Sequence, residues 1–153
     1  MRLNARNFSH ARLATEPDFL ASVDLFAGLS KKERSTFQKL GRMATHLPNR
    51  KIIEQGSRAR ESVALHIIIE GNVNVVENGK LVNELGKGDC FGELALIDGK
   101  PRSADVITTK PTDCFILDRT EFQHYLDKHP KFALNMLVAL CKKLRDTSGR
   151  ASL

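Results

Sequence analysis

The chain of 153 residues is 41% hydrophobic and 27% charged, which is typical of one globular domain with a full apolar core. No apolar run approaches the roughly 18 residues of a membrane-spanning helix, so we expect a cytoplasmic protein without a membrane span. The net charge of +6 permits attraction to anionic partners but does not by itself indicate nucleic acid binding. Three cysteines form no C-x-x-C pair, and we interpret them as reduced thiols in or near the core: Cys90, Cys114 and Cys141.

The first segment, residues 1–17, contains Arg2, Arg6 and Arg12 and no acidic residue before Glu16. It lacks the apolar core of about 7 to 15 residues that a secretory signal requires. We predict a flexible basic arm, with an organellar transit peptide as the alternative.

Two helices are expected in residues 18–44. Apolar residues recur at helical spacing in residues 18–25, which predicts the first helix. Ser30 and Glu33 have the spacing of a capping box, which predicts a second helix with Phe37 facing inward.

A β-rich region follows in residues 45–117, where short apolar runs alternate with glycine, asparagine, proline and aspartate turns. Asn78-Gly79 lies between V-N-V-V and L-V, a strong signal for a two-residue hairpin. We therefore predict a mainly β domain, an antiparallel β-roll of the jelly-roll or double-stranded β-helix type with helices at both ends.

Residues 118–148 are expected to be helical again, and residues 149–153 to form a tail. Asp118 is placed to cap a short helix, and a longer helix is expected after Pro130. Its apolar face is expected to pack on the β-roll, a subunit interface is the alternative, and both can hold at once. That face contains Ala133, Leu137, Leu140 and Leu144, with Met136 beside them. We interpret the basic end as a solvated face: Lys142, Lys143 and Arg145.

Residues 86–104, G-K-G-D-C-F-G-E-L-A-L-I-D-G-K-P-R-S-A, hold the densest chemistry in the chain. The glycines permit tight turns and a close approach of the backbone to a ligand. A short helical turn predicted over residues 93–97 presents free amides to an anion, and the Arg102 guanidinium matches two phosphate oxygens. Glu93 repels phosphate but can accept a hydrogen bond from a sugar hydroxyl. These residues predict a ligand that carries both a phosphate and a ribose.

The runs F-G-E-L-A-L-I and P-R-S-A resemble the phosphate-binding cassette of the cyclic-nucleotide-binding domain family. This family includes the catabolite activator protein, the regulatory subunit of protein kinase A and cyclic-nucleotide-gated channels. Similar landmarks at residues 25–30, 67–73 and 118–122 extend the resemblance over about residues 18–145. The resemblance implies a cyclic-nucleotide-binding domain, which we place at residues 18–148.

The resemblance also implies roles for individual residues. Glu93 would bind the ribose 2′-hydroxyl, the helix-turn amides and Arg102 the cyclic phosphate, and the residue after Arg102 the phosphate or the base. The implied ligand-binding residues are Gly92, Glu93, Leu94, Ala95, Pro101, Arg102, Ser103 and Ala104. For the purine we expect a pocket of barrel residues and one capping side chain: Val73, Val75, Leu81, Leu85 and Arg145, with Thr147 and Ser148 as alternatives to Arg145.

The function implied is a sensor or regulatory domain, without catalysis, metal or cofactor, whose last helix changes its packing when the ligand binds. The Ser103 hydroxyl is compatible with cAMP and with cGMP, and we favour cAMP. A protein effector or a homodimer is expected to use the last helix. The alternatives are an interaction domain of the same fold that binds no nucleotide, and a sensory fragment of a longer transcription regulator or channel.

Two other classes are not favoured. A metal enzyme in a small β-barrel needs a close histidine pair, and His66 stands alone in its strand, where we expect a hydrogen-bonded or surface imidazole. Catabolite-activator-like regulators add a helix-turn-helix domain after the last helix, and no such domain fits before Leu153, so we expect no direct DNA binding. Met1 favours a natural start of the chain.

Overall fold

The computed structural model describes residues 18–57 and 63–151, with side chains up to residue 146 in the last helix. The predicted basic arm, residues 1–17, lies outside the described residues. The helical elements in chain order are η1 (Phe19–Ser22), η2 (Asp24–Phe26), α2 (Lys31–Leu40), α3 (Glu93–Asp98), α4 (Arg119–Lys128) and α5 (Pro130–Ala151). The strands are β1 (Arg42–His46), β2 (Lys51–Ile53), β3 (Ala64–Glu70), β4 (Asn72–Glu77), β5 (Lys80–Gly86), β6 (Cys90–Phe91), β7 (Asp105–Thr108) and β8 (Thr112–Asp118).

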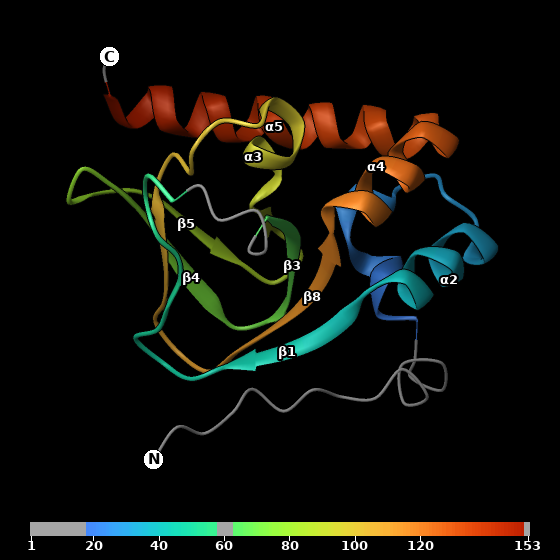
Figure 1. Cartoon of the computed structure of the whole chain (residues 1–153), viewed down its shortest axis with the longest axis horizontal. Coiled ribbons are helices and arrows are strands. Elements are labelled where there is room, and N and C mark those ends of the chain that lie inside the picture. Colours follow the sequence, from blue (N-terminus) through green and yellow to red (C-terminus); the bar gives the residue numbers. More distant parts are fainter. Residues whose placement is uncertain (1–17, 58–62, 152–153) are drawn as a thin grey trace.

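The strands of the described residues form two antiparallel sheets, one in the order β1-β8-β3-β6 and the other in the order β2-β7-β4-β5. Helices lie at one end of this β-roll, and α5 runs along its whole length above α3 (Figure 1). The predicted fold class, a β-roll with flanking helices, is confirmed.

Local signals in the sequence correctly predict the start of one helix and the turn of one hairpin. The Ser30 hydroxyl accepts a hydrogen bond from the Glu33 amide at 3.1 Å, and the Ser30 amide donates to Glu33 Oε1 at 3.1 Å, so the predicted capping box opens α2. Asn78 and Gly79 have φ angles of 52° and 77° and join β4 to β5, as a two-residue hairpin turn requires. Both predictions are confirmed.

The first predicted helix, by contrast, is two short 3₁₀ turns. Val23 lies between η1 and η2 with φ −91° and ψ 123°, an extended conformation that interrupts the helix. Leu20, Val23, Leu25 and Phe26 are all buried. Residues that must bury side chains in several directions cannot all lie on the single face that one α-helix offers to the core.

Two apolar cores fill the domain. One lies between the two sheets and includes Ile68, Val73 and Val106. The other lies between the β1-β8-β3-β6 sheet and the helices, and its centre is a cluster of aromatic rings in mutual contact: Phe26, Phe37, Phe115, Phe122, Tyr125 and Phe132. The first sheet is therefore covered on both faces, and α5 is anchored by the second core.

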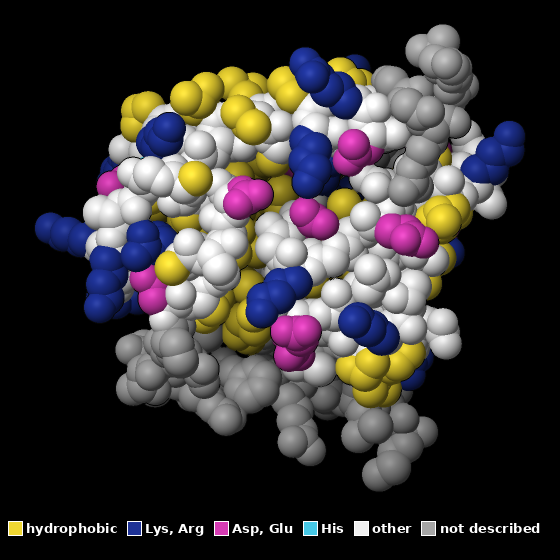
Figure 2. Space-filling model, turned by 180° about the vertical axis from the view of Figure 1, so that it is seen from behind, with side chains coloured by type: hydrophobic (Ala, Val, Ile, Leu, Met, Phe, Trp, Pro, Cys, Tyr) yellow, Lys and Arg dark blue, Asp and Glu magenta, His cyan; other side chains and the backbone are white. Residues whose placement is uncertain are grey.

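α5 turns a different face to the roll than the sequence predicts. Phe132 and Met136 are buried and Leu140 is partly buried, whereas Leu137 and Leu144 are 59% and 69% exposed. The prediction that Leu137 and Leu144 pack on the roll is wrong, because the large aromatic ring of Phe132 enters the core and fixes the rotation of the helix. Figure 2 shows hydrophobic side chains along the edge of the molecule where α5 lies.

Candidate functional site

A cavity of about 280 Å³ lies between the β2-β7-β4-β5 sheet, α3 and α5. Its volume is close to the lower end of the range of small-molecule sites, about 300 to 1,000 Å³. Its walls are largely apolar, with charged groups from Glu93, Arg102 and Lys143 inside and Glu77 at the exposed rim. This cavity is the candidate functional site.

Gly92 opens α3 and allows the backbone to approach its neighbours closely. Its φ angle is +87°, in the left-handed region that favours glycine. A Cβ atom at this position would lie 2.4 Å from the Ala64 carbonyl oxygen and 3.4 Å from Arg102 Nη1. Any larger residue would therefore displace the β3 backbone, whereas the distance to Arg102 Nη1 is an ordinary van der Waals contact.

Arg102 reaches the start of α3 from the segment that follows it. Its Nη1 donates a hydrogen bond to the Gly92 carbonyl oxygen at 2.9 Å, and the residue is only 6% exposed. The Arg102 backbone is held by hydrogen bonds with Gly56 and Ser57. Burial lowers the pKa of Arg102, while the charge of Glu93 acts in the opposite direction. A guanidinium retains its charge in proteins, so the site contains a buried cation beside the first turn of α3.

Glu93 is the first residue of α3, and its side chain is 3% exposed. Lys143 Nζ of α5 donates a hydrogen bond to Glu93 Oε1 at 2.7 Å and another to the Cys90 carbonyl oxygen. Burial lowers the pKa of Lys143, but Cys90 and Glu93 raise it, and the net shift is upward. The interpretation of Lys143 as part of a solvated face is wrong, because its side chain is 25% exposed and binds two groups of the site.

His66 lies behind this site, stacked on Phe91 with ring centroids 4.7 Å apart. It is 7% exposed, and its Nδ1 is buried without a hydrogen-bond partner. Burial, together with the charge of Arg102, lowers its pKa to about 3. The prediction of a hydrogen-bonded or surface imidazole is wrong, because both faces of β3 are covered, which leaves His66 buried and its Nδ1 without a partner.

Most of the residues expected in the site line the same cavity. From the cassette these are Gly92, Glu93, Leu94, Ala95, Arg102, Ser103 and Ala104, and from the β-roll Val75 and Leu85. Four expected residues lie outside the lining: Val73 is in the core between the sheets, Leu81 is 48% exposed, and neither Pro101 nor Arg145 borders the cavity. The side chains of Thr147 and Ser148 lie outside the described part of the chain.

Several lining residues were not predicted: Ile53, Glu77, Val82, Asn83, Phe91, Val106 and Lys143. Alternation along strands could have found three of them, because Glu77, Asn83 and Val106 each lie two positions from a predicted residue and so face the same side. Lys143 carried no such signal, since its partner is fifty positions away in the sequence.

The thiols differ in exposure. Cys90 and Cys114 are buried, and burial raises the pKa of each to about 12. Cys141, on α5, is exposed, so the expectation of a core or near-core position is wrong for this residue. In the part of the chain that the structure describes, no group of three or more histidine, cysteine or acidic side chains could hold a metal ion. No helix among the described residues has the length and apolarity needed to cross a bilayer.

The signature of the cyclic nucleotide-binding domain matches residues 45–129, more than half of the chain. Strands β2 to β8, the α3 turn with Gly92 and Glu93, and Arg102 lie within this match. The chain therefore belongs to the cyclic-nucleotide-binding domain family.

Individual relatives come from different branches of that family. The chain is 30% identical over 141 residues to a cGMP-dependent protein kinase of Eimeria tenella, covering 91% of this chain and 13% of the kinase. The regulatory subunit of a cAMP-independent protein kinase A from Trypanosoma brucei is similar with a TM-score of 0.77 and 26% identity, over 93% of this chain and 51% of that one. The Thermus thermophilus catabolite activator protein is similar with a TM-score of 0.72 and 25% identity, over 83% and 61% of the two chains.

Proposed function

We propose that the chain is a regulatory domain that binds a 3′,5′-cyclic nucleotide in the cavity between the β-roll, α3 and α5, and that it performs no catalysis. The observation that carries this proposal is the buried pair of opposite charges, Arg102 and Glu93, at the two sides of the first turn of α3. Arg102 supplies a fork for two phosphate oxygens, and Glu93 supplies an acceptor for the ribose hydroxyl. The α3 amides, Ser103 and Ala104 complete the phosphate contacts.

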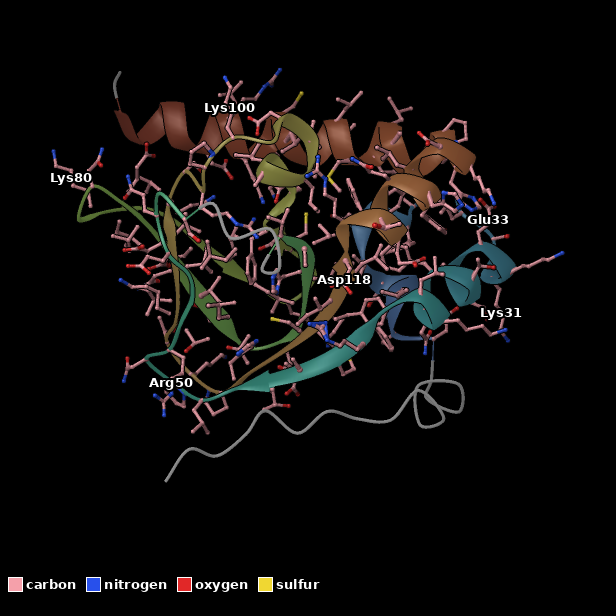
Figure 3. The ribbon with its side chains drawn as sticks, viewed as in Figure 1. Lys31, Glu33, Arg50, Lys80, Lys100 and Asp118 are labelled. Atoms are coloured by element: carbon pink, nitrogen blue, oxygen red, sulfur yellow. The ribbon has the colours of Figure 1, made fainter. Side chains whose placement is uncertain are left out.

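Calorimetric titration with cAMP, cGMP and 5′-AMP tests this proposal. The Arg102→Ala variant should bind the cyclic nucleotide about 2 to 5 kcal/mol more weakly, because a buried phosphate loses its charged partner. Arg50→Ala is the matched control, since Arg50 is exposed and lies at the end of the β-roll remote from α3 (Figure 3). Equal affinities of the two variants would remove Arg102 from the site, and no binding by the native chain would refute the proposed function.

We favour cAMP as the ligand, with cGMP as the other candidate. Ser103 lines the cavity, and its hydroxyl is suited to meet either the phosphate or the guanine amino group. The remaining walls around the base are apolar, with Val75, Leu85 and Val106 among them, so few groups distinguish the two purines. Titration with both nucleotides under the same conditions identifies the preferred ligand, and a preference for cGMP of tenfold or more would overturn our choice.

We further propose that α5 changes its packing when the nucleotide binds. The helix contacts the site through Lys143 and the core through Phe132 and Met136, so a shift of α3 is transmitted to it. The exposed Cys141 is a native attachment point for a fluorescent maleimide, whereas Cys90 and Cys114 are buried and protonated at neutral pH. Saturating ligand should alter the emission of the label, and an unchanged spectrum despite proven binding would refute the switch.

A second candidate function is protein docking on the outer face of α5. Four large side chains are 52% to 69% exposed on this helix: Leu134, Leu137, Val138 and Leu144. Their spacing gives one apolar stripe, which suits a protein effector or a second copy of the chain. The Leu137→Asp variant should remove any self-association seen by light scattering, and a monomeric native chain would leave the effector as the occupant.

Free thiols at all three cysteines agree with the cytoplasmic location that we propose.

A further inference from the structure

Lys143 is the only described residue of α5 that lines the candidate nucleotide site. Its ammonium group bridges two elements, since it donates to Glu93 Oε1 at 2.7 Å and to the carbonyl oxygen of Cys90, the first residue of β6. Two of its three donors are therefore used, one by β6 and one by the first residue of α3. The neighbouring Lys142 and Arg145 are exposed and do not line this cavity.

The charges in the cavity indicate what this contact does. Arg102 and Lys143 contribute two positive charges and Glu93 one negative charge, while Glu77 lies at the exposed rim, where water screens it. The three inner groups thus sum to +1, which a cyclic phosphate with a single negative charge would neutralise. Without Lys143, the buried Glu93 carboxylate and the phosphate would share one cation, and a buried charge without a partner is strongly unfavourable.

Glu93 can serve Lys143 and a sugar hydroxyl at the same time. A carboxylate accepts hydrogen bonds on both oxygens, and Lys143 is bonded to Oε1. The Lys143 contact fixes the side-chain rotamer of Glu93, so Oε2 is held in one position. A carboxylate that is already oriented loses less entropy when it accepts a hydroxyl.

We propose that Lys143 is a positioning residue of the nucleotide site, which acts through Glu93 and makes α5 part of the ribose-binding wall. This inference rests on the proposed function. It means that ligand affinity and the docking of α5 are coupled: the nucleotide binds more tightly when Lys143 is in place, and by the same free energy it favours the docked helix.

Titration of cAMP and 2′-deoxy-cAMP into Lys143→Met, Lys143→Arg and Lys142→Met tests the proposal. Lys143→Met should weaken cAMP binding at least tenfold and reduce the preference for cAMP over 2′-deoxy-cAMP to below threefold. Lys143→Arg should keep both within threefold of the native values, because it retains the cation, and Lys142→Met is the matched control without effect. An unchanged preference for the 2′-hydroxyl in Lys143→Met, or tighter binding of cAMP, would overturn the proposal.

A second comparison covers the case in which Lys143→Met does not fold, since this variant leaves the Glu93 carboxylate buried alone. The Glu93→Gln variant and the Glu93→Gln, Lys143→Met double variant carry no unpaired acid at this position. If Lys143 acts through Glu93, these two variants bind cAMP within threefold of each other, and a further tenfold loss in the double variant would show a direct role instead. Failure of the native chain to bind either nucleotide refutes the proposed function, whereas native binding that is insensitive to Lys143 refutes only this inference.

Discussion

Replacing Gly92 by alanine tests the close approach on which the site depends, and the chain contains a matched control. Gly88 and Gly92 have nearly the same φ angle, 88° and 87°. A Cβ atom at Gly88 would meet nothing within 4 Å, whereas at Gly92 it would lie 2.4 Å from the Ala64 carbonyl oxygen. The two alanine variants therefore share the conformational cost and differ only in the steric one.

The expected magnitudes follow from these two terms. An alanine in the left-handed region costs about 1 to 2 kcal/mol, and the restriction of the unfolded chain offsets about 0.4 to 1 kcal/mol of this. Gly88→Ala should thus lower the free energy of unfolding by about 1 kcal/mol. At Gly92 the backbone of β3 must also shift, which adds about 1 to 3 kcal/mol as other overpacked sites do. We expect Gly92→Ala to be destabilised by about 2 to 4 kcal/mol.

Urea unfolding followed by circular dichroism measures both variants under one set of conditions. The slope of the transition should stay unchanged, so that the difference in midpoint reports stability alone. Gly92→Ala should also weaken nucleotide binding, because a shift of the backbone at this position moves the Gly92 carbonyl oxygen, which accepts the hydrogen bond from Arg102 Nη1. If the two variants differ by less than about 0.5 kcal/mol in unfolding free energy, the argument from close approach at Gly92 is refuted.

Two further predictions concern pH. The pKa of buried His66 is about 3 in the folded chain and near 6.5 when unfolded, so only the unfolded chain takes up this proton between those values. The free energy of unfolding therefore carries no penalty from His66 above pH 6.5 and falls by up to about 1.4 kcal/mol per pH unit below it. The His66→Phe variant should reduce this pH dependence in urea unfolding measured at pH 4 to 7. Arg34 lowers the pKa of Asp18 by a hydrogen bond from Nη2 at 2.7 Å, so the pair stabilises the fold above the unfolded pKa and is lost in acid. Asp18→Asn should lower the free energy of unfolding at pH 7 and have a smaller effect at pH 2, and an equal effect at both pH values would contradict this.

Features that depend on neighbours in the sequence could be predicted from it. The capping box joins Ser30 to Glu33 over three positions, and the turn at Asn78 needs only a residue that tolerates positive φ followed by glycine. The phosphate cassette is similarly local, since Glu93 and Arg102 lie within ten positions of each other. For such features, both partners of the interaction lie within about ten positions of each other in the sequence.

Features that depend on how elements pack could not be predicted in the same way. A hydrogen-bonded or surface imidazole was expected at His66 because alternation along β3 identifies two faces but does not show that both are covered. Leu137 was expected to pack on the β-roll because helical spacing gives the apolar positions without the rotation of the helix. The Lys143 contact requires the whole β-roll to place β6 beside α5, so no pattern in the last helix indicates it.

The arrangement of α5 shows how one helix can link the candidate site to a partner. Phe132 and Met136 anchor it in the core, Lys143 holds the acidic residue of the cavity, and Leu137 belongs to the exposed stripe on the opposite side. A helix is rigid over this length, so its contacts on one side constrain the position of the other. A ligand that strengthens the Lys143 contact therefore constrains the position of the outer face of α5, which we propose for docking. This effect needs no contact between ligand and partner. Under our proposals, Lys143→Met should weaken both nucleotide binding and the effect of nucleotide on docking. Leu137→Asp should abolish docking and leave unchanged the nucleotide affinity that is measured in the absence of a docked partner.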